Sequence, residues 1–93
     1  MQEKFSEFRC KEIINVCDGC RLGFVSDLEL ELPSGRILAI IAPGPRRFFG
    51  LFGREYDYWI PWPCIRRIGS DIILVEADLE KFRRPLEKKG LLE

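Results

Sequence analysis

The stretch RLGFVSDLELEL, residues 21–32, alternates between two kinds of residue. Its even positions are mostly apolar: Leu22, Phe24, Ser26, Leu28, Leu30 and Leu32. Its odd positions are mostly polar and end on the carboxylates of Asp27, Glu29 and Glu31. A period of two is typical of a β-strand with one face buried. The stretch therefore predicts one strand over residues 21–32, with leucines inward and a carboxylate stripe that is an ordinary solvent face, not an acid–base pair.

Turn signals stand on both sides of this strand. Asp18-Gly19 precedes it and favours a tight two-residue hairpin turn, which joins it to a shorter strand over residues 13–16. Pro33-Ser34-Gly35 follows it, and the apolar run RILAIIA, residues 36–42, then predicts a strand buried on both faces. Together these segments predict a three-stranded meander.

Short strands continue after the meander, which ends at Pro43-Gly44-Pro45 because two prolines interrupt a ladder. Residues 58–60, 65–68 and 72–75 each have strand composition and are separated by turn residues. The pattern predicts an all-β fold, a small antiparallel barrel, over residues 1–77. Residues 78–93 are highly charged and predict one or two helical turns, with Asp78 as N-cap, followed by a loosely structured C-terminal tail.

The composition narrows the classes of function. Ninety-three residues suffice for one domain, and 46% hydrophobic residues suffice for a core. The formal net charge is +0, so a long-range field for nucleic acid is missing. The chain contains no His, the commonest general base and metal ligand. We therefore expect a protein that is not an enzyme and has no cofactor.

Two further features bear on location. No apolar run approaches the ~20 residues of a membrane span, and the charged start MQEKFSEFRCKE lacks the apolar centre of a secretory signal. These features predict a cytoplasmic protein whose four Cys are reduced thiols.

The order of motifs resembles the PRC-barrel superfamily. The resemblance covers residues 5–75 and rests on Ser6-Glu7-Phe8, Lys11-Glu12-Ile13, Asp18-Gly19, Leu22-Gly23-Phe24-Val25, Gly35-Arg36-Ile37 and the closing GSDIILV at residues 69–75. Residues 43–55 and 60–65 resemble the small single-domain branch known as sporulation proteins of endospore-forming bacteria. The resemblance implies a compact antiparallel barrel. It also implies a protein-interaction module, because relatives in a photosynthetic reaction centre and in ribosome maturation act by contacting other proteins.

The cysteines offer a metal or thiol alternative. Cys17 and Cys20 form a C-x-x-C across a turn, and a tetrahedral zinc site would need two further ligands, for which Cys10 and Cys64 are the candidates. No second C-x-x-C pairs those two. We expect instead that Cys10 and Cys64 are small buried hydrophobes and that the turn pair are free thiols.

The segment between residues 46 and 54 is the sharpest candidate for a partner-binding surface. It combines apolar side chains with arginines that suit anionic or aromatic partners. The candidate residues are Arg46, Arg47, Phe48, Phe49, Leu51, Phe52 and Arg54. The alternatives are a lid whose phenylalanines close the barrel, or a peripheral contact with a membrane surface.

The sequence argues against nucleic acid as a partner. Tyr56, Tyr58, Trp59 and Trp62 could stack bases beside Arg66 and Arg67, but alternating aromatic residues of a strand are more often core. The sequence thus predicts a non-enzymatic protein-interaction adaptor that binds another protein and forms a homodimer. A zinc- or thiol-dependent regulatory protein and an RNA- or ribosome-associated adaptor are the alternatives.

Overall fold

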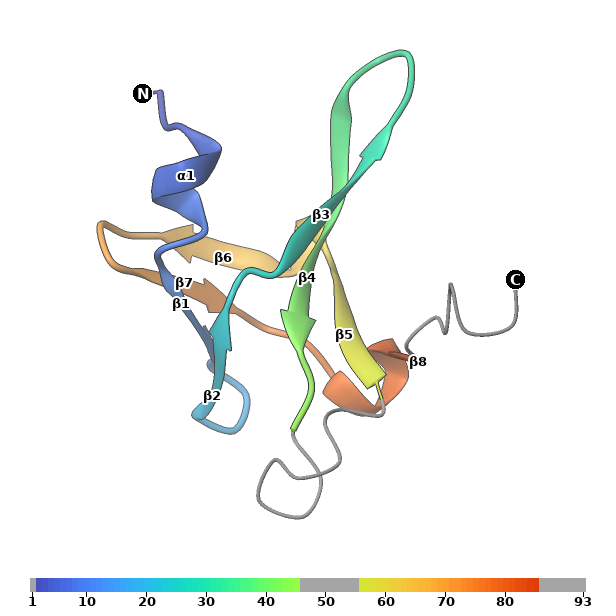
Figure 1. The fold of residues 1–93 in the computed structure, drawn as a ribbon. Helices are drawn as coiled ribbons and strands as arrows, with labels where there is room; N and C mark the ends of the chain where they lie inside the picture. Colours follow the sequence, from blue (N-terminus) through green and yellow to red (C-terminus); the bar gives the residue numbers. More distant parts are fainter. Residues whose placement is uncertain (1, 46–55, 86–93) are drawn as a thin grey trace.

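The computed structural model describes residues 2–45 and 56–85, which form two four-stranded sheets (Figure 1). One sheet has the order β2-β1-β7-β6 and the other the order β3-β4-β5-β8. The first comprises β1 (Glu12–Asn15), β2 (Cys20–Phe24), β6 (Ile65–Ile68) and β7 (Ile72–Val75). The second comprises β3 (Asp27–Glu31), β4 (Arg36–Pro43), β5 (Tyr56–Pro61) and β8 (Arg83–Pro85). The helical turns are α1 (Phe5–Phe8), η2 (Trp62–Cys64) and η3 (Leu79–Phe82). The predicted small all-β barrel is confirmed.

The strand predicted over residues 21–32 is wrong, because the chain changes sheets in its middle. β2 and β3 belong to different sheets, and residues 25 and 26 connect them. Val25 is buried although it occupies an odd position, so the alternation in which even positions face inward is interrupted there. The Ser26 amide and hydroxyl both donate to the Ile41 carbonyl, at 2.8 and 3.0 Å. The predicted meander is therefore two hairpins, β1–β2 and β3–β4, at a corner of the barrel.

The first hairpin turn is longer than predicted. Its connection comprises residues 16–19, because Asn15 pairs with Cys20. Gly19 has a φ of +70°, and the Asp18 carboxylate accepts a bond from the Cys20 amide at 2.9 Å. Asp18 thus stabilises the turn through its side chain, as Asp commonly does.

One of the described strand pairs is parallel, and it joins the β1–β2 hairpin to the β6–β7 hairpin at the middle of the first sheet. β1 lies beside β7 with Ile13 opposite Ile73, whereas the other strand pairs are antiparallel. The inward side chains of both sheets form one core in which Ile13, Ile40, Ile60, Ile73 and Val75 are fully buried. Packing of two apolar faces is what stabilises such a fold.

A buried asparagine joins β1 to the chain that leaves β7. The Asn15 amide donates to the Ala77 carbonyl at 2.9 Å, and its oxygen accepts from the Ala77 amide at 3.2 Å. Asn15 is 1% exposed, so these bonds satisfy groups that water does not reach.

The segment after residue 77 continues the fold. The predicted helical turn is η3, although the Asp78 side chain makes no capping bond. Leu79 and Phe82 pack against the core, and β8, which the sequence does not predict, pairs with β5. Residues 78–85 therefore cover one edge of the second sheet.

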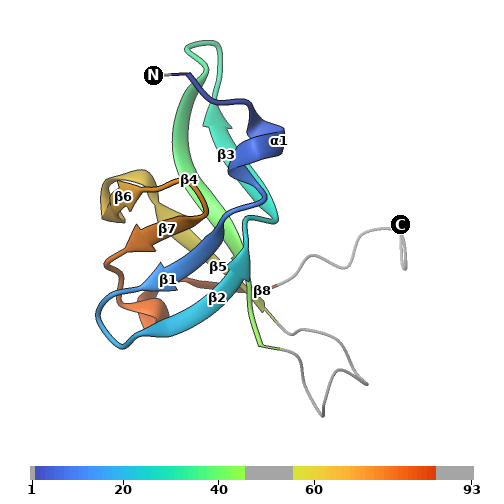
Figure 2. The same ribbon diagram turned by 90° about the vertical axis from the view of Figure 1, so that its left-hand side faces the viewer.

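The β3–β4 hairpin of the second sheet extends past the strands of the first sheet and shapes the surface described next (Figure 1). A register shift between Glu29 and Leu30 leaves Leu28 opposite Ile40 and Leu30 opposite Ile37. In both views α1 and the turn of this hairpin lie at the same end of the molecule (Figures 1 and 2). Leu28 and Leu30 share one face because strand side chains alternate.

Candidate functional site

An apolar cleft lies at the end of the molecule that carries α1 and the β3–β4 hairpin. Its volume is about 270 Å³. We define the apolar cleft by its lining residues: Phe5, Phe8, Leu28, Ile37, Trp62 and Ile68, with Glu3 at the rim. These side chains come from α1, β3, β4, η2 and β6 (Figure 1).

The α1 wall is held by one buried ring and one ion pair. Phe5 and Phe8 stand three residues apart, so they lie on one side of the single helical turn. Phe8 is buried, and its ring centroid lies 6.3 Å from that of Trp62. Lys11, only 5% exposed, forms an ion pair with Glu3 ahead of the helix. Phe5 remains 44% exposed beside this anchored turn.

The hairpin wall continues the apolar surface outward from the cleft. Ile37 lines the cleft, and Leu30 lies opposite it in the register, on the same face. Leu30 is 50% exposed and Leu32 is 79% exposed. Across the cleft, Ile68 of β6 is 41% exposed. Large apolar side chains that gather on one surface are a mark of interaction sites.

Among the described residues, charged groups at the cleft and on its hairpin wall form two ion pairs. Glu3 pairs with Lys11, and Arg36 lies 3.1 Å from the Glu31 carboxylate, which also accepts a bond from the Ser34 hydroxyl. Glu12 and Arg21 do not line the cleft; the Glu12 carboxylate, 2.7 Å from the Arg21 guanidinium, raises the pKa of Arg21. A surface whose charges are paired has little net field, which suits an uncharged apolar partner surface.

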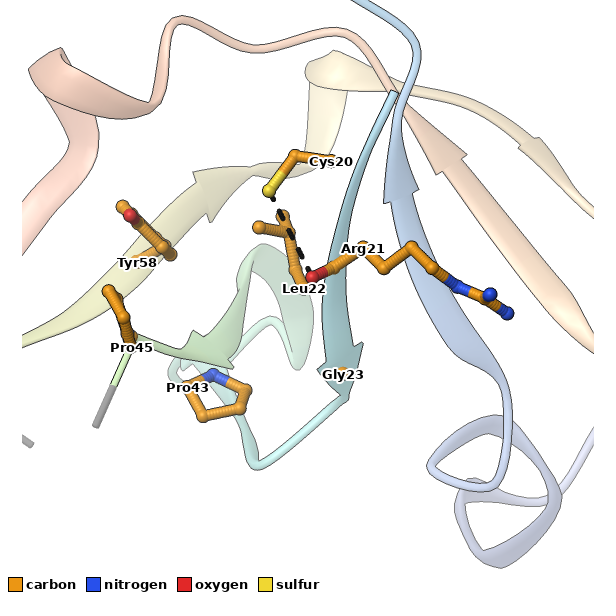
Figure 3. A pocket seen from close by; sticks show the side chains of 8 residues that line it. Cys20, Arg21, Leu22, Gly23, Pro43, Pro45 and Tyr58 are labelled. Atoms are coloured by element: carbon orange, nitrogen blue, oxygen red, sulfur yellow. Dashed lines mark hydrogen bonds between the residues drawn. The ribbon is translucent and has the colours of Figure 1, made fainter. Parts of the chain in front are cut away.

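The predicted binding residues Arg46, Arg47, Phe48, Phe49, Leu51, Phe52 and Arg54 lie outside the described residues. A second hollow is lined by described residues that include Pro45. Its lining includes Cys20, Leu22, Pro43, Pro45 and Tyr58. Figure 3 shows the Arg21 side chain pointing away from it. We assign no site to this hollow because the chain continues from its edge, at Pro45, into residues 46–55.

The four cysteines do not come together as a ligand set. Cys10, Cys17 and Cys20 are exposed, and Cys64 is half-buried. The prediction that Cys10 is buried is wrong: it follows α1 at the surface, where its thiol donates to the Ser6 carbonyl at 3.2 Å. Within residues 2–45 and 56–85, no three His, Cys, Asp or Glu side chains gather as metal ligands would.

The aromatic residues also separate, because alternate strand positions face opposite sides. Tyr58 points into the core beside Tyr56, with ring centroids 5.5 Å apart, whereas Trp62 lines the cleft. Trp59 lies on the outer face, donates to the Glu29 carboxylate at 2.9 Å and carries Arg84 over its ring. Arg66 pairs with Glu76. These described residues therefore form no common stacking platform for bases.

Burial has one marked effect on acidity. It raises the pKa of Tyr58 to about 12, with a further contribution from the hydrogen bond to Tyr56. The phenol stays protonated through neutral pH, so Tyr58 serves as a core residue with a polar tip.

Sequence reasoning missed the cleft because its walls come from separate predicted elements. Leu30 and Leu32 follow the apolar alternation of residues 21–32, which predicts that both are buried. α1 was not predicted, since four residues give too little periodicity. One feature of the sequence does indicate the exposed leucine. Leu32 stands directly before the turn at residues 33–35, and a side chain at the end of a hairpin has no further strand to cover it.

Comparison with known proteins places this architecture in a family. The family model for the PRC-barrel domain matches residues 1–81, so the chain belongs to the PRC-barrel family. It is similar to the Bacillus subtilis (strain 168) protein named "Probable sporulation protein YlmC", with 43% identity over 75% of this chain and 86% of that protein. It is also similar to YmxH of the same organism, with 35% identity over 83% of this chain and 92% of that protein.

The helices are short throughout the part of the chain that the structure describes. None of them is long and apolar enough to cross a bilayer.

Proposed function

We propose that this chain is a non-enzymatic protein-interaction adaptor that acts in sporulation in the cytoplasm, and that the apolar cleft is its contact surface. The process is carried over from the name of the relative YlmC. The mode of action follows from the chemistry of the cleft: its lining is apolar apart from Glu3, and that carboxylate is paired with Lys11. An apolar concave surface with paired charges binds, whereas catalysis needs positioned polar groups.

The observation that carries the proposal is where the exposed hydrophobic residues lie. Among the described residues, six large hydrophobic side chains are exposed, and four of them, Phe5, Leu30, Leu32 and Ile68, are between 41% and 79% exposed at the cleft end of the molecule. Phe5 and Ile68 line the cleft, and Leu30 lies opposite its lining residue Ile37, with Leu32 two residues further along the hairpin. The other two, Val16 and Phe24, do not line the cleft. Scattered single hydrophobic residues are normal on a surface, but a contiguous group around a hollow is typical of an interface. This surface includes none of residues 46–54, which remain a second candidate contact.

A site-specific photo-crosslinker tests this proposal. We place benzoylphenylalanine at position 32, beside the cleft, and in a control chain at Val16, which is also apolar and 47% exposed. Val16 follows β1 at the end away from α1 (Figure 1). In sporulating cells we expect protein adducts from position 32 and at least fivefold fewer from position 16. Equal yields, or adducts from position 16 alone, would reject the cleft as the contact surface.

A further inference from the structure

We propose that the occupant of the apolar cleft is the β3–β4 hairpin tip of a second copy of this chain, in a reciprocal dimer. The inference rests on the proposed function, because it names a partner for the same surface. Each copy supplies one cleft and one tip bearing Leu30 and Leu32, so a twofold axis forms two identical contacts.

The hairpin tip is chemically suited to the cleft. Its two leucines are apolar, and its charged residues Glu31 and Arg36 pair with each other, so docking leaves no unpaired charge at the tip. On the receiving side, Glu3 is paired with Lys11. Neutral surfaces of this kind associate by removing apolar area from water.

The exposed apolar residues supply about half to two-thirds of the area that a specific dimer contact needs. With typical side-chain areas of roughly 200 Å², Phe5, Leu30, Leu32 and Ile68 together expose on the order of 400 Å² per copy. A specific interface needs about 600–800 Å² per partner. The half-buried lining residues and the flanks of the hairpin supply the remainder when both contacts form.

The alternative of edge-to-edge strand pairing is disfavoured at β3. An antiparallel pair of β3 strands centred on Glu29 would place Glu29 opposite Glu29 and Asp27 opposite Glu31. Like charges directly opposite each other destabilise a sheet, and charged side chains commonly protect an exposed edge. The carboxylate stripe therefore favours docking through the leucine face.

Sedimentation equilibrium of the full chain over micromolar concentrations tests the inference. We expect the wild type to show twice the 10.9 kDa chain mass. The double variant Leu30→Ser, Leu32→Ser should raise the dimer dissociation constant at least 100-fold, and the single variant Leu32→Ser, at the most exposed position, about tenfold or more. The control Val16→Ser should remain dimeric. Circular dichroism establishes that each variant is folded.

Two results would overturn the inference. One is a monomeric wild type at all concentrations, and the other is a folded Leu32→Ser variant that dimerises as tightly as the wild type. The crosslinking experiment separates these failures from failure of the proposed function. If position 32 yields adducts with a different protein and none of twice the chain mass, the cleft binds a partner and the self-association is wrong.

Discussion

The barrel interior and the apolar cleft contain the same kinds of side chain, which are buried in the interior and exposed at the cleft. In the interior, Ile13, Ile40, Ile60 and Ile73 are fully buried because a second sheet lies across from each of them. At the cleft, Leu30 and Leu32 continue the apolar phase of β3 but extend beyond the opposite sheet. The difference teaches that an alternating pattern identifies an apolar face, whereas the length of the covering layer decides whether that face is core or surface.

The largest difference between the two regions is expected in the free energy of unfolding when one apolar side chain in each is truncated. We expect Ile60→Ala to lower the free energy of unfolding by about 2–5 kcal/mol, because the cavity is enclosed on all sides. Leu32→Ala should change it by less than about 0.5 kcal/mol in dilute monomer, since the side chain is 79% exposed. Urea titration measures both. A comparable loss at position 32 would mean that Leu32 belongs to the core.

A smaller effect on the free energy of unfolding is expected at the buried Asn15, which bonds to the backbone of Ala77. Asn15→Ala removes the two hydrogen bonds between the Asn15 side chain and the amide and carbonyl of Ala77, and leaves these buried peptide groups unsatisfied. We expect a loss of about 1–3 kcal/mol. Ser34→Ala, at the exposed hairpin turn, is the matched control and should cost less than about 0.5 kcal/mol. Equal losses would contradict the distinction between a closed interior and an open cleft end.

The smallest effect concerns alkaline pH. The unfolded chain releases the Tyr58 proton near pH 10, but the folded chain holds it to about pH 12. Between these two pH values the folded state binds more protons than the unfolded state. The free energy of unfolding therefore has its full value below pH 10 and falls as the pH rises through this window. Urea midpoints at pH 9, 10 and 11 should decline, and Tyr58→Phe should flatten the decline. An unchanged slope in that variant would assign the effect to other groups.

Sequence patterns predicted the elements better than their assembly. Strand composition located residues 58–60, 65–68 and 72–75 because β-branched and aromatic runs between turn residues have few alternatives. The parallel pairing of β1 with β7 joins residues about 60 positions apart, and single-sequence periodicity carries no information on such pairing. The change of sheets at Val25 and Ser26 was hidden because one odd valine barely disturbs a period of two.

The candidate site was less predictable for a related reason. A cleft built from α1, β3, β4, η2 and β6 depends on how distant segments pack. The sequence identified Phe8 and Ile37 only as family motif residues, Leu28 as an inward residue and Trp62 as a candidate base-stacking residue. The aromatic and arginine-rich residues 46–54 drew attention by composition, yet they lie outside the described residues. Composition finds conspicuous residues, whereas a concave site requires the tertiary arrangement.

Isotope-filtered nuclear Overhauser spectroscopy tests the central claim most directly. A mixture of labelled and unlabelled chains reports contacts between copies only, and Leu32 and Trp62 provide well-separated methyl and indole signals. We predict intermolecular contacts between the Leu32 methyl groups and the Trp62 ring, absent in Leu32→Ser. Dimers that show no such contact, or a Leu32 methyl that meets Trp62 only within its own chain, would contradict the account.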